Sequence, residues 1–283
     1  MATAHSLLWN DIKPVFVDIA PESLNLDPTK IEASISDKTT AILPVHCYGR
    51  PCDVLAIKKI ADRYNLKIIY DSAHAFGVRD KEGSILRHGD LSILSFHATK
   101  VFNTFEGGAI ICHDERTKQE IDRLKNFGFN DEITVVSAGI NGKMSEFNAA
   151  LGILQLKYVD TVIALRKKID LAYRAKLSNI RGIICLKYPQ GLDFNYTYFP
   201  IFVEADYPIS RDDLYHKLKE QNIYSRRYFY PLISDFNMYK EISSEKKAQI
   251  PTATSACQRV LCLPIYPGLS IEQINLITKV IAR

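Results

Sequence analysis

Lys100 and Asp71 are the two residues whose types and spacing suggest specific chemistry. Lys100 lies in the run SFHATKVFNTFEGG, 29 positions after Asp71 in the run IIYDSAHAFGV. A lysine amine can form a Schiff base with the aldehyde of pyridoxal phosphate (PLP), and an aspartate paired with the ring nitrogen keeps that nitrogen protonated. The pair therefore predicts a PLP site in which Lys100 is the nucleophile and Asp71 makes the ring an electron sink.

Both residues follow segments that have the pattern of buried strands. KIIYD is a short apolar run that ends in the carboxylate of Asp71, and LSILSF is a continuous apolar run that places His97 and Lys100 just beyond its end. Ligands of open α/β sheets bind outside the carboxyl ends of the strands. Alone, Asp71 could instead cap the following turn, and Lys100 could be a solvated surface cation. Because both follow apolar strands, we expect them to converge on one pocket.

Residues 1–155 alternate short apolar segments with segments of helical periodicity. The expected strands are PVFVDI, TAILPVH, KIIYD, LSILSFH and GGAIICHD, and the expected helices are PTKIEASI, VLAIKKIADRYN and ERTKQEIDRLKNF. Alternation of this kind predicts a largely parallel, doubly wound sheet. We therefore expect residues 1–155 to form a large PLP-binding α/β domain.

Residues 156–283 have the pattern of an interdomain helix followed by a small C-terminal α/β domain. Helical periodicity runs from Met144 to about Leu177, with a break at which Asp160 could cap a second piece. The strand-like runs YTYFPIFV and YSRRYFYPL follow, and helices are expected around residues 211–221 and 270–282. The chain therefore predicts two domains of unequal size.

Composition and charge exclude several classes of protein. A chain of 283 residues, 47% of them hydrophobic, can bury a large core. Its 36 basic and 32 acidic side chains are mixed along the chain and leave a formal net charge of only +4, so no nucleic-acid-binding stripe is expected. The six cysteines lack CxxC or histidine-spaced patterns, which predicts reduced thiols and no metal site. Without a secretory leader pattern or an apolar run of about 18 residues, we expect a cytoplasmic protein that does not enter a membrane.

Several spaced motifs resemble those of one enzyme family. DSAHAFG, SFHATK, EGGAIICHDE and GINGKMSEFNAALGILQL are similar to motifs of the sugar-nucleotide aminotransferases, which are PLP-dependent enzymes of fold type I. The resemblance extends over essentially the whole chain, and HATKVFNTFEGG is most similar to enzymes that aminate keto-6-deoxyhexoses linked to thymidine diphosphate (dTDP). It implies transfer of an amino group from L-glutamate to a nucleotide-linked 4-keto- or 3-keto-6-deoxyhexose, for the biosynthesis of amino sugars and O-antigen-type polysaccharides. It also implies a homodimer with shared active sites.

The resemblance implies roles for three residues close to Asp71 and Lys100 in the sequence. Ala73 would pack its methyl group against the cofactor ring, His74 would hydrogen-bond the phenolic oxygen of PLP, and Ser95 would bond the phosphate. Outside this motif, His74 could be a core histidine satisfied by the backbone, and Ser95 could satisfy backbone groups at a strand end.

Five further residues are expected to take part in binding. In the family, the loop GINGKMSEFNAA crosses the dimer interface, so either Asn141 or Lys143 would lie near the PLP phosphate of the partner subunit. His97 would lie near the nucleotide or cofactor and contact the substrate. Arg226 and Tyr228 would bind the substrate as well, because the cations and aromatic rings of YSRRYFYP could grip a diphosphate and a base. Each of these residues has an alternative interpretation. Asn141 and Lys143 could lie in an ordinary polar loop, His97 could have a packing role, and YSRRYFYP could be a solvated basic turn.

The start of the chain departs from the family pattern. Family members carry about 85 further residues before the segment that matches ATA, including a turn whose N–H groups hold the PLP phosphate and an aromatic residue that stacks on the ring. Because this sequence begins with MATAHSLLWN, we expect a large domain that is truncated at its N-terminus. Two alternatives follow: a non-catalytic remnant that folds and dimerises without competent cofactor binding, and a PLP-dependent sugar dehydratase. A histidine replaces the Schiff-base lysine in such dehydratases, so Lys100 argues against the second.

Overall fold

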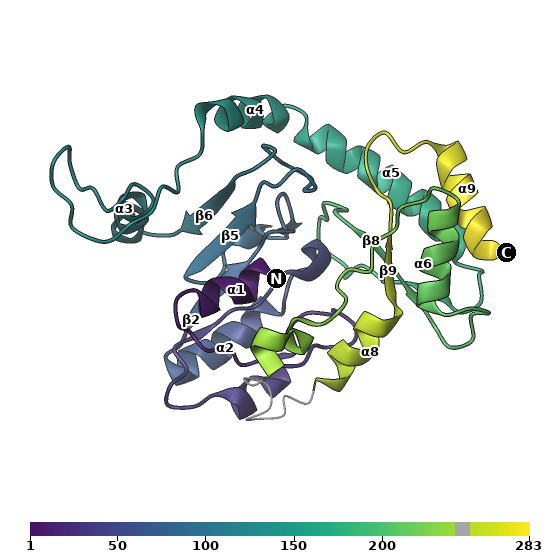
Figure 1. The fold of residues 1–283 in the computed structure, drawn as a ribbon, viewed down its shortest axis with the longest axis horizontal. Coiled ribbons are helices and arrows are strands. Elements are labelled where there is room, and N and C mark those ends of the chain that lie inside the picture. The colour runs from purple at the N-terminus through teal and green to yellow at the C-terminus, as the bar shows by residue number, and fades with distance from the viewer. Residues whose placement is uncertain (241–249) are drawn as a thin grey trace.

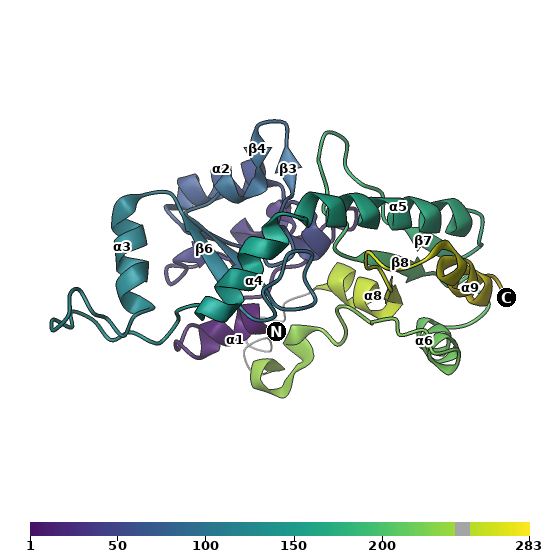
Figure 2. The ribbon, with the colours of Figure 1, turned by 90° about the horizontal axis from the view of Figure 1, so that it is seen from above.

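The computed structural model describes residues 1–240 and 250–283, which form two halves (Figure 1). The first half is built on a four-stranded sheet and the second on a three-stranded sheet. Two consecutive helices, α4 (Glu146–Leu156) and α5 (Val159–Leu177), connect the halves along one side of the molecule (Figure 2). The expected boundary between residues 155 and 156 falls in the last turn of α4, and the division into domains stays a prediction.

The first sheet brings the ends of two predicted strands to one edge. Its order is β1-β2-β5-β6, in which β1 (Ala41–Ile42), β2 (Lys67–Asp71) and β5 (Leu91–Ser95) are parallel and β6 (Gly108–Cys112) is antiparallel to β5. Asp71 pairs in register with Ile93, two residues before the end of β5. The carboxyl ends of β2 and β5 therefore lie side by side, as the sequence predicted.

Helices α1 (Ala2–Leu8) and α2 (Val54–Tyr64) lie on opposite sides of this sheet (Figure 2). α2 buries Ile57 and Ile60, three residues apart on one helical face, against Ile68 and Tyr70 of β2. The Asp53 side chain begins the helix by accepting a hydrogen bond from the N–H of the third helical residue. Helix α3 (Glu115–Leu124) follows β6, and the short hairpin of β3 (Arg79–Asp80) and β4 (Gly83–Ser84) lies in the connection between β2 and β5.

Two expected elements of the first half were wrong. PVFVDI forms no strand, and only Ile19 makes an isolated bridge, to Leu26. Asp18 within this segment is buried, and its carboxylate accepts hydrogen bonds from the backbone of the second half, a long-range contact that the local apolar pattern does not contain. PTKIEASI forms two separate 3-10 turns, Pro28–Lys30 and Glu32–Ser34, instead of one helix.

The second half packs helices on an antiparallel sheet. The sheet order is β7-β8-β9, formed by Ile183–Cys185, Phe199–Val203 and Val260–Leu263. Side chains of α5, α6 (Arg211–Glu220) and α9 (Ile271–Ala282) form one hydrophobic core with this sheet. The fully buried members of this core include Tyr173, Phe199, Leu218, Leu261 and Ile274. Helix α8 (Pro251–Arg259) leads directly into β9.

Two details of the second half differ from the expected pattern. The expected cap at Asp160 was wrong, because α5 begins at Val159 and Asp160 lies in its first turn. YSRRYFYPL forms no strand beyond the isolated bridge between Arg226 and Cys262.

Among residues 1–240 and 250–283, no helix is long and apolar enough to cross a membrane.

Candidate active site

The carboxylate of Asp71 is held from two sides at the end of β2. Its Oδ1 accepts a hydrogen bond from Ala73 N at 3.0 Å, and its Oδ2 accepts one from Thr3 Oγ1 at 2.6 Å. Its backbone is fixed as well, because Asp71 N donates to Pro44 O at 2.9 Å and Asp71 O accepts from His46 N at 3.0 Å. The side chain therefore has a fixed direction beyond the strand end. Thr3 of α1 was not anticipated from the sequence, because nothing local pairs it with Asp71.

Lys100 lies in the turn after β5, close enough to Asp71 for the two charges to interact. Its N–H donates to His97 O at 2.9 Å, which closes the turn. Burial lowers the pKa of the Lys100 ammonium, and the Asp71 carboxylate offsets part of this by raising it. A lowered pKa increases the fraction of neutral amine, which is the nucleophilic form.

His74 is a partly buried residue whose ring nitrogen Nδ1 is buried. Its ring stacks on Phe229 with the centroids 5.6 Å apart, and it meets Tyr198 edge-on at 4.9 Å. Burial, helped by the positive charge of Lys100, lowers the pKa of His74 to about 3, so the ring is neutral at pH 7. Its Nδ1 has no hydrogen-bond partner among the described residues. Such an atom is suited to a ligand, because a buried polar group without a partner is costly.

Ala73 and Ser95 occupy the same edge of the sheet. Ala73 follows β2 by two residues and donates its N–H to Asp71, so its position depends on that carboxylate. Ser95 is the last residue of β5, and its Oγ accepts a long 3.4 Å hydrogen bond from His97 N. The proposed contacts of Ala73 with the ring and of Ser95 with a phosphate stay predictions.

His97, Asn141 and Lys143 are all exposed in this chain. The Nε2 of His97 lies 3.6 Å from Glu106 Oε1. Asn141 forms a bridge with Asn126, and Lys143 donates to Asn126 Oδ1 at 2.7 Å. Figure 1 shows the segment between α3 and α4 extending away from the sheet. The expected roles of these three residues in binding substrate or the partner subunit's cofactor stay predictions.

An aromatic cluster from the second half covers His74. The segment with Arg226 and Tyr228 runs beside β9, since Arg226 pairs with Cys262. The carbonyl of Tyr228 accepts a hydrogen bond from Tyr48 at 2.5 Å, and the ring of Phe229 stacks on Tyr48 as well as on His74. Substrate binding by Arg226 and Tyr228 stays a prediction. The sequence analysis did not identify Tyr48, Tyr198 or Phe229 as site residues. The aromatic run YTYFP could have indicated Tyr198, and the run RRYFYP could have indicated Phe229.

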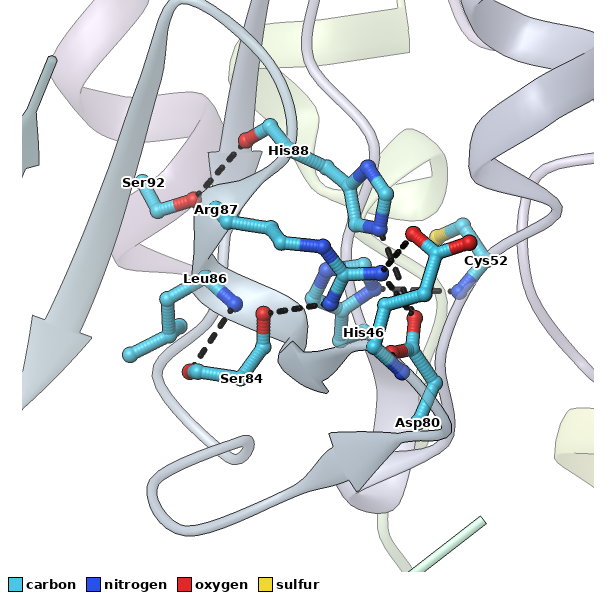
Figure 3. Close-up of polar contacts among 9 residues, drawn as sticks. His46, Cys52, Asp80, Ser84, Leu86, Arg87, His88 and Ser92 are labelled. Carbon is cyan, nitrogen blue, oxygen red and sulfur yellow. Dashed lines mark hydrogen bonds and ion pairs between the residues drawn. The ribbon is translucent and has the colours of Figure 1, made fainter. Parts of the chain in front are cut away.

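A second polar cluster contains His46, Cys52, Asp80 and Arg87 (Figure 3). His46, whose N–H donates to Asp71 O, accepts a hydrogen bond on Nδ1 from Cys52 N at 3.0 Å. Burial lowers the pKa of His46 to about 3, so it is neutral at pH 7. Beyond it, Arg87 forms an ion pair with Asp80 at 2.7 Å. This cluster supports the strand end on which the site is built, and the sequence motifs did not indicate it.

Comparison with known proteins shows the family of this chain. The sequence model of the DegT/DnrJ/EryC1/StrS aminotransferase family matches residues 1–282. The chain belongs to this family. The DegT/DnrJ/EryC1/StrS family and its solved members are PLP-dependent, and the expected family, fold type and aminotransferase class are confirmed.

Individual members of this aminotransferase family are close in sequence and structure. The chain is 55% identical to a dTDP-4-amino-4,6-dideoxy-D-glucose transaminase of Shigella dysenteriae and 50% identical to one of Escherichia coli, covering 99% of this chain and 76% of each relative. The structure of DesI in the presence of its TDP-sugar product superposes with a TM-score of 0.94 at 32% identity, over 100% of this chain and 72% of DesI. The expected truncation of the start is not confirmed by these matches.

Proposed function

We propose that this chain uses PLP, held at Lys100, to transfer an amino group from L-glutamate to a dTDP-linked 4-keto-6-deoxyhexose. The observation that carries the proposal is the convergence of Lys100, Asp71 and the unpartnered Nδ1 of His74 beyond the ends of β2 and β5. An amine, a carboxylate and a neutral ring nitrogen are the groups that the aldehyde, the pyridine nitrogen and the phenolic oxygen of PLP require. The residues present therefore fit the cofactor.

Each side chain of the site has one task in this proposal. When bound, PLP supplies an electron sink that stabilises negative charge on the substrate carbon. Asp71, oriented by Thr3 and Ala73, would hold a proton on the pyridine nitrogen because a nearby carboxylate favours the charged ring. Lys100 would bind the aldehyde and, once displaced by the donor amine, carry the proton between the cofactor and the substrate carbon.

The remaining residues would orient the cofactor and the substrate. His74 would donate to the phenolic oxygen from Nδ1, Ala73 would pack on the ring and Ser95 would bind the phosphate. Arg226, Tyr228 and His97 would contact the nucleotide sugar. The substrate assignment is supported by the relatives of Shigella dysenteriae and Escherichia coli, whose names place the amino group on carbon 4 of a dTDP-linked sugar. The dTDP group and the carbon-4 ketone are therefore the most specific elements of the proposed substrate. We also expect the protein to act in the cytoplasm.

A homodimer with shared active sites is part of the proposal. Helix α4 is apolar around most of its surface but leaves Phe147 76% exposed and Ile153 63% exposed, and Ile140 in the preceding loop is 70% exposed. Exposed apolar patches of this kind favour protein association. The same loop carries Asn141 and Lys143, so a partner that covers α4 could receive these side chains at its phosphate site.

An amino-transfer assay with purified chain tests the proposed function. The chain is incubated with PLP, L-glutamate and dTDP-4-keto-6-deoxyglucose, with the 3-keto isomer and a GDP-linked 4-keto sugar as comparison substrates. We expect one 2-oxoglutarate per aminated dTDP sugar and faster turnover of the 4-keto substrate. A sugar product formed without 2-oxoglutarate would indicate a dehydratase, and no product with any substrate would indicate a non-catalytic remnant.

A further inference from the structure

The loop that carries Ala73 and His74 is held by a segment more than a hundred positions later in the chain. This loop runs from Ser72 to Val78, has no helix or strand of its own, and leads into Arg79. Arg79 pairs with Asp193 through two backbone hydrogen bonds of 3.0 and 2.8 Å. The geometry of the loop therefore depends on residues 193–198 of the second half.

Asn195 is the side chain through which that segment holds the loop. It is 1% exposed, and its Nδ2 donates to His74 O at 2.7 Å and to Phe76 O at 2.9 Å. Its Oδ1 accepts from Thr197 N at 3.2 Å. Of the two ends of the amide, only the nitrogen can donate to the two carbonyl oxygens, so the chemistry of the partners fixes which way the amide faces.

The space around this amide is filled. A Cβ atom at Gly49 would lie 2.7 Å from His74 O and 2.8 Å from Asn195 Oδ1, distances that a real side chain does not adopt. The segments of Gly49 and Asn195 thus meet the loop of His74 at its carbonyl, and only a glycine fits at position 49. The backbone of His74 has little room to move while the amide is in place.

The ring of His74 contacts the same distant segment. Tyr198, three residues after Asn195, packs edge-on against the imidazole at 4.9 Å, and Nδ1 is left without a partner among the described residues. We propose that Asn195 is a positioning residue that fixes the backbone of His74 and thereby aims its imidazole at the bound cofactor. This inference rests on the proposed function, because His74 orients PLP only if the chain binds PLP.

A double-mutant cycle between Asn195 and His74 tests the inference in the full chain. Asn195→Asp keeps the shape of the side chain but places an oxygen against the two carbonyls. We expect it to raise the dissociation constant of PLP, titrated by visible absorption, on the order of tenfold. It should also shift the pH midpoint of the visible band in the same direction as His74→Phe does. In the His74→Phe background, Asn195→Asp should change the dissociation constant by less than about twofold, because its effect passes through His74.

Controls separate positioning from general loss of stability. Tyr207→Phe removes another buried hydrogen bond to a carbonyl, the 2.6 Å bond to Ile281 O, far from the site in the second half, and should leave the pH midpoint unchanged. Thermal melts without PLP check that each variant is folded, and Asn195→Ser replaces Asn195→Asp if the latter does not melt cooperatively. A tenfold effect of equal size in both backgrounds, or none in either, would overturn the inference. If the unaltered chain gives no visible band, the proposed function fails first.

Discussion

Asp18 offers a quantitative test of how the two halves of the chain are joined. Its side chain is 0% exposed and forms an ion pair with Lys30 at 2.9 Å. Its carboxylate also accepts hydrogen bonds from Thr252 N at 3.1 Å and Ala253 N at 2.9 Å, in the first turn of α8. A negative charge at a helix N-terminus is favourable, so Asp18 stabilises both α8 and its contact with the first half.

The pKa of Asp18 gives the size of this stabilisation. Burial raises the pKa, but the hydrogen bonds from Lys30 and from the backbone of Ala253 and Thr252 outweigh it and lower the pKa from 3.8 to about 2. Because the pKa is lower in the folded state, the stabilisation is fully present above the unfolded value and is lost as the pH falls through about 2. A shift of this size contributes about 2 kcal/mol at pH 7, nearly all of it retained at about pH 4 and about half at pH 3.

Replacement of Asp18 by asparagine should reproduce that magnitude. Urea unfolding followed by circular dichroism should give a free energy of unfolding about 2 kcal/mol lower for Asp18→Asn than for the unaltered chain at pH 7, with the difference halved near pH 3. Asp37→Asn, at an exposed carboxylate, is the matched control and should change little. A variant as stable as the unaltered chain at pH 7, or a difference that persists unchanged in acid, would refute the reasoning.

Two further predictions concern the site and the dimer. Gly49→Ala should lower the melting temperature more than Gly83→Ala and should weaken PLP binding. Both glycines have a positive φ, but only Gly49 has no space for a Cβ atom. Equal effects of the two substitutions in paired thermal melts would contradict this. Phe147→Glu should shift the chain from dimer to monomer in analytical ultracentrifugation and reduce amino transfer, whereas Leu55→Glu, at an equally exposed position on α2, should do neither. A Phe147→Glu variant that stays dimeric would exclude α4 from the interface.

The strands that precede the two reactive side chains, β2 before the Asp71 carboxylate and β5 before Lys100, could be predicted because their signal is local. Continuous apolar runs identify β2 and β5, and parallel neighbours bring their carboxyl ends together without further information. PVFVDI has the same local signal and is nevertheless not a strand, and Asp18 within it takes part in a hydrogen-bond network with α8. That network joins residues more than two hundred positions apart, and no local pattern contains it.

The parts of the site that sequence missed are all long-range contacts. Thr3 reaches Asp71 from α1, Phe229 stacks on His74 from the second half, and Asn195 holds the His74 backbone through its amide. Each residue type is ordinary in its own segment, and only the fold gives it a partner. The family motifs identified the residues expected to touch the cofactor, whereas the groups that orient those residues had to be found in the structure.

The most direct test of the account is covalent labelling of Lys100. The purified chain is mixed with PLP, reduced with borohydride and digested, and the peptides are analysed by mass spectrometry. The account predicts a visible absorption band that borohydride abolishes, and the mass of reduced PLP on the peptide that contains Lys100. Lys100→Arg should lose both signals, whereas Lys118→Arg, at an exposed lysine on α3 that pairs with Asp122, should keep them. Labelling of other lysines with Lys100 unmodified, or a band that survives in Lys100→Arg, would contradict the central claim.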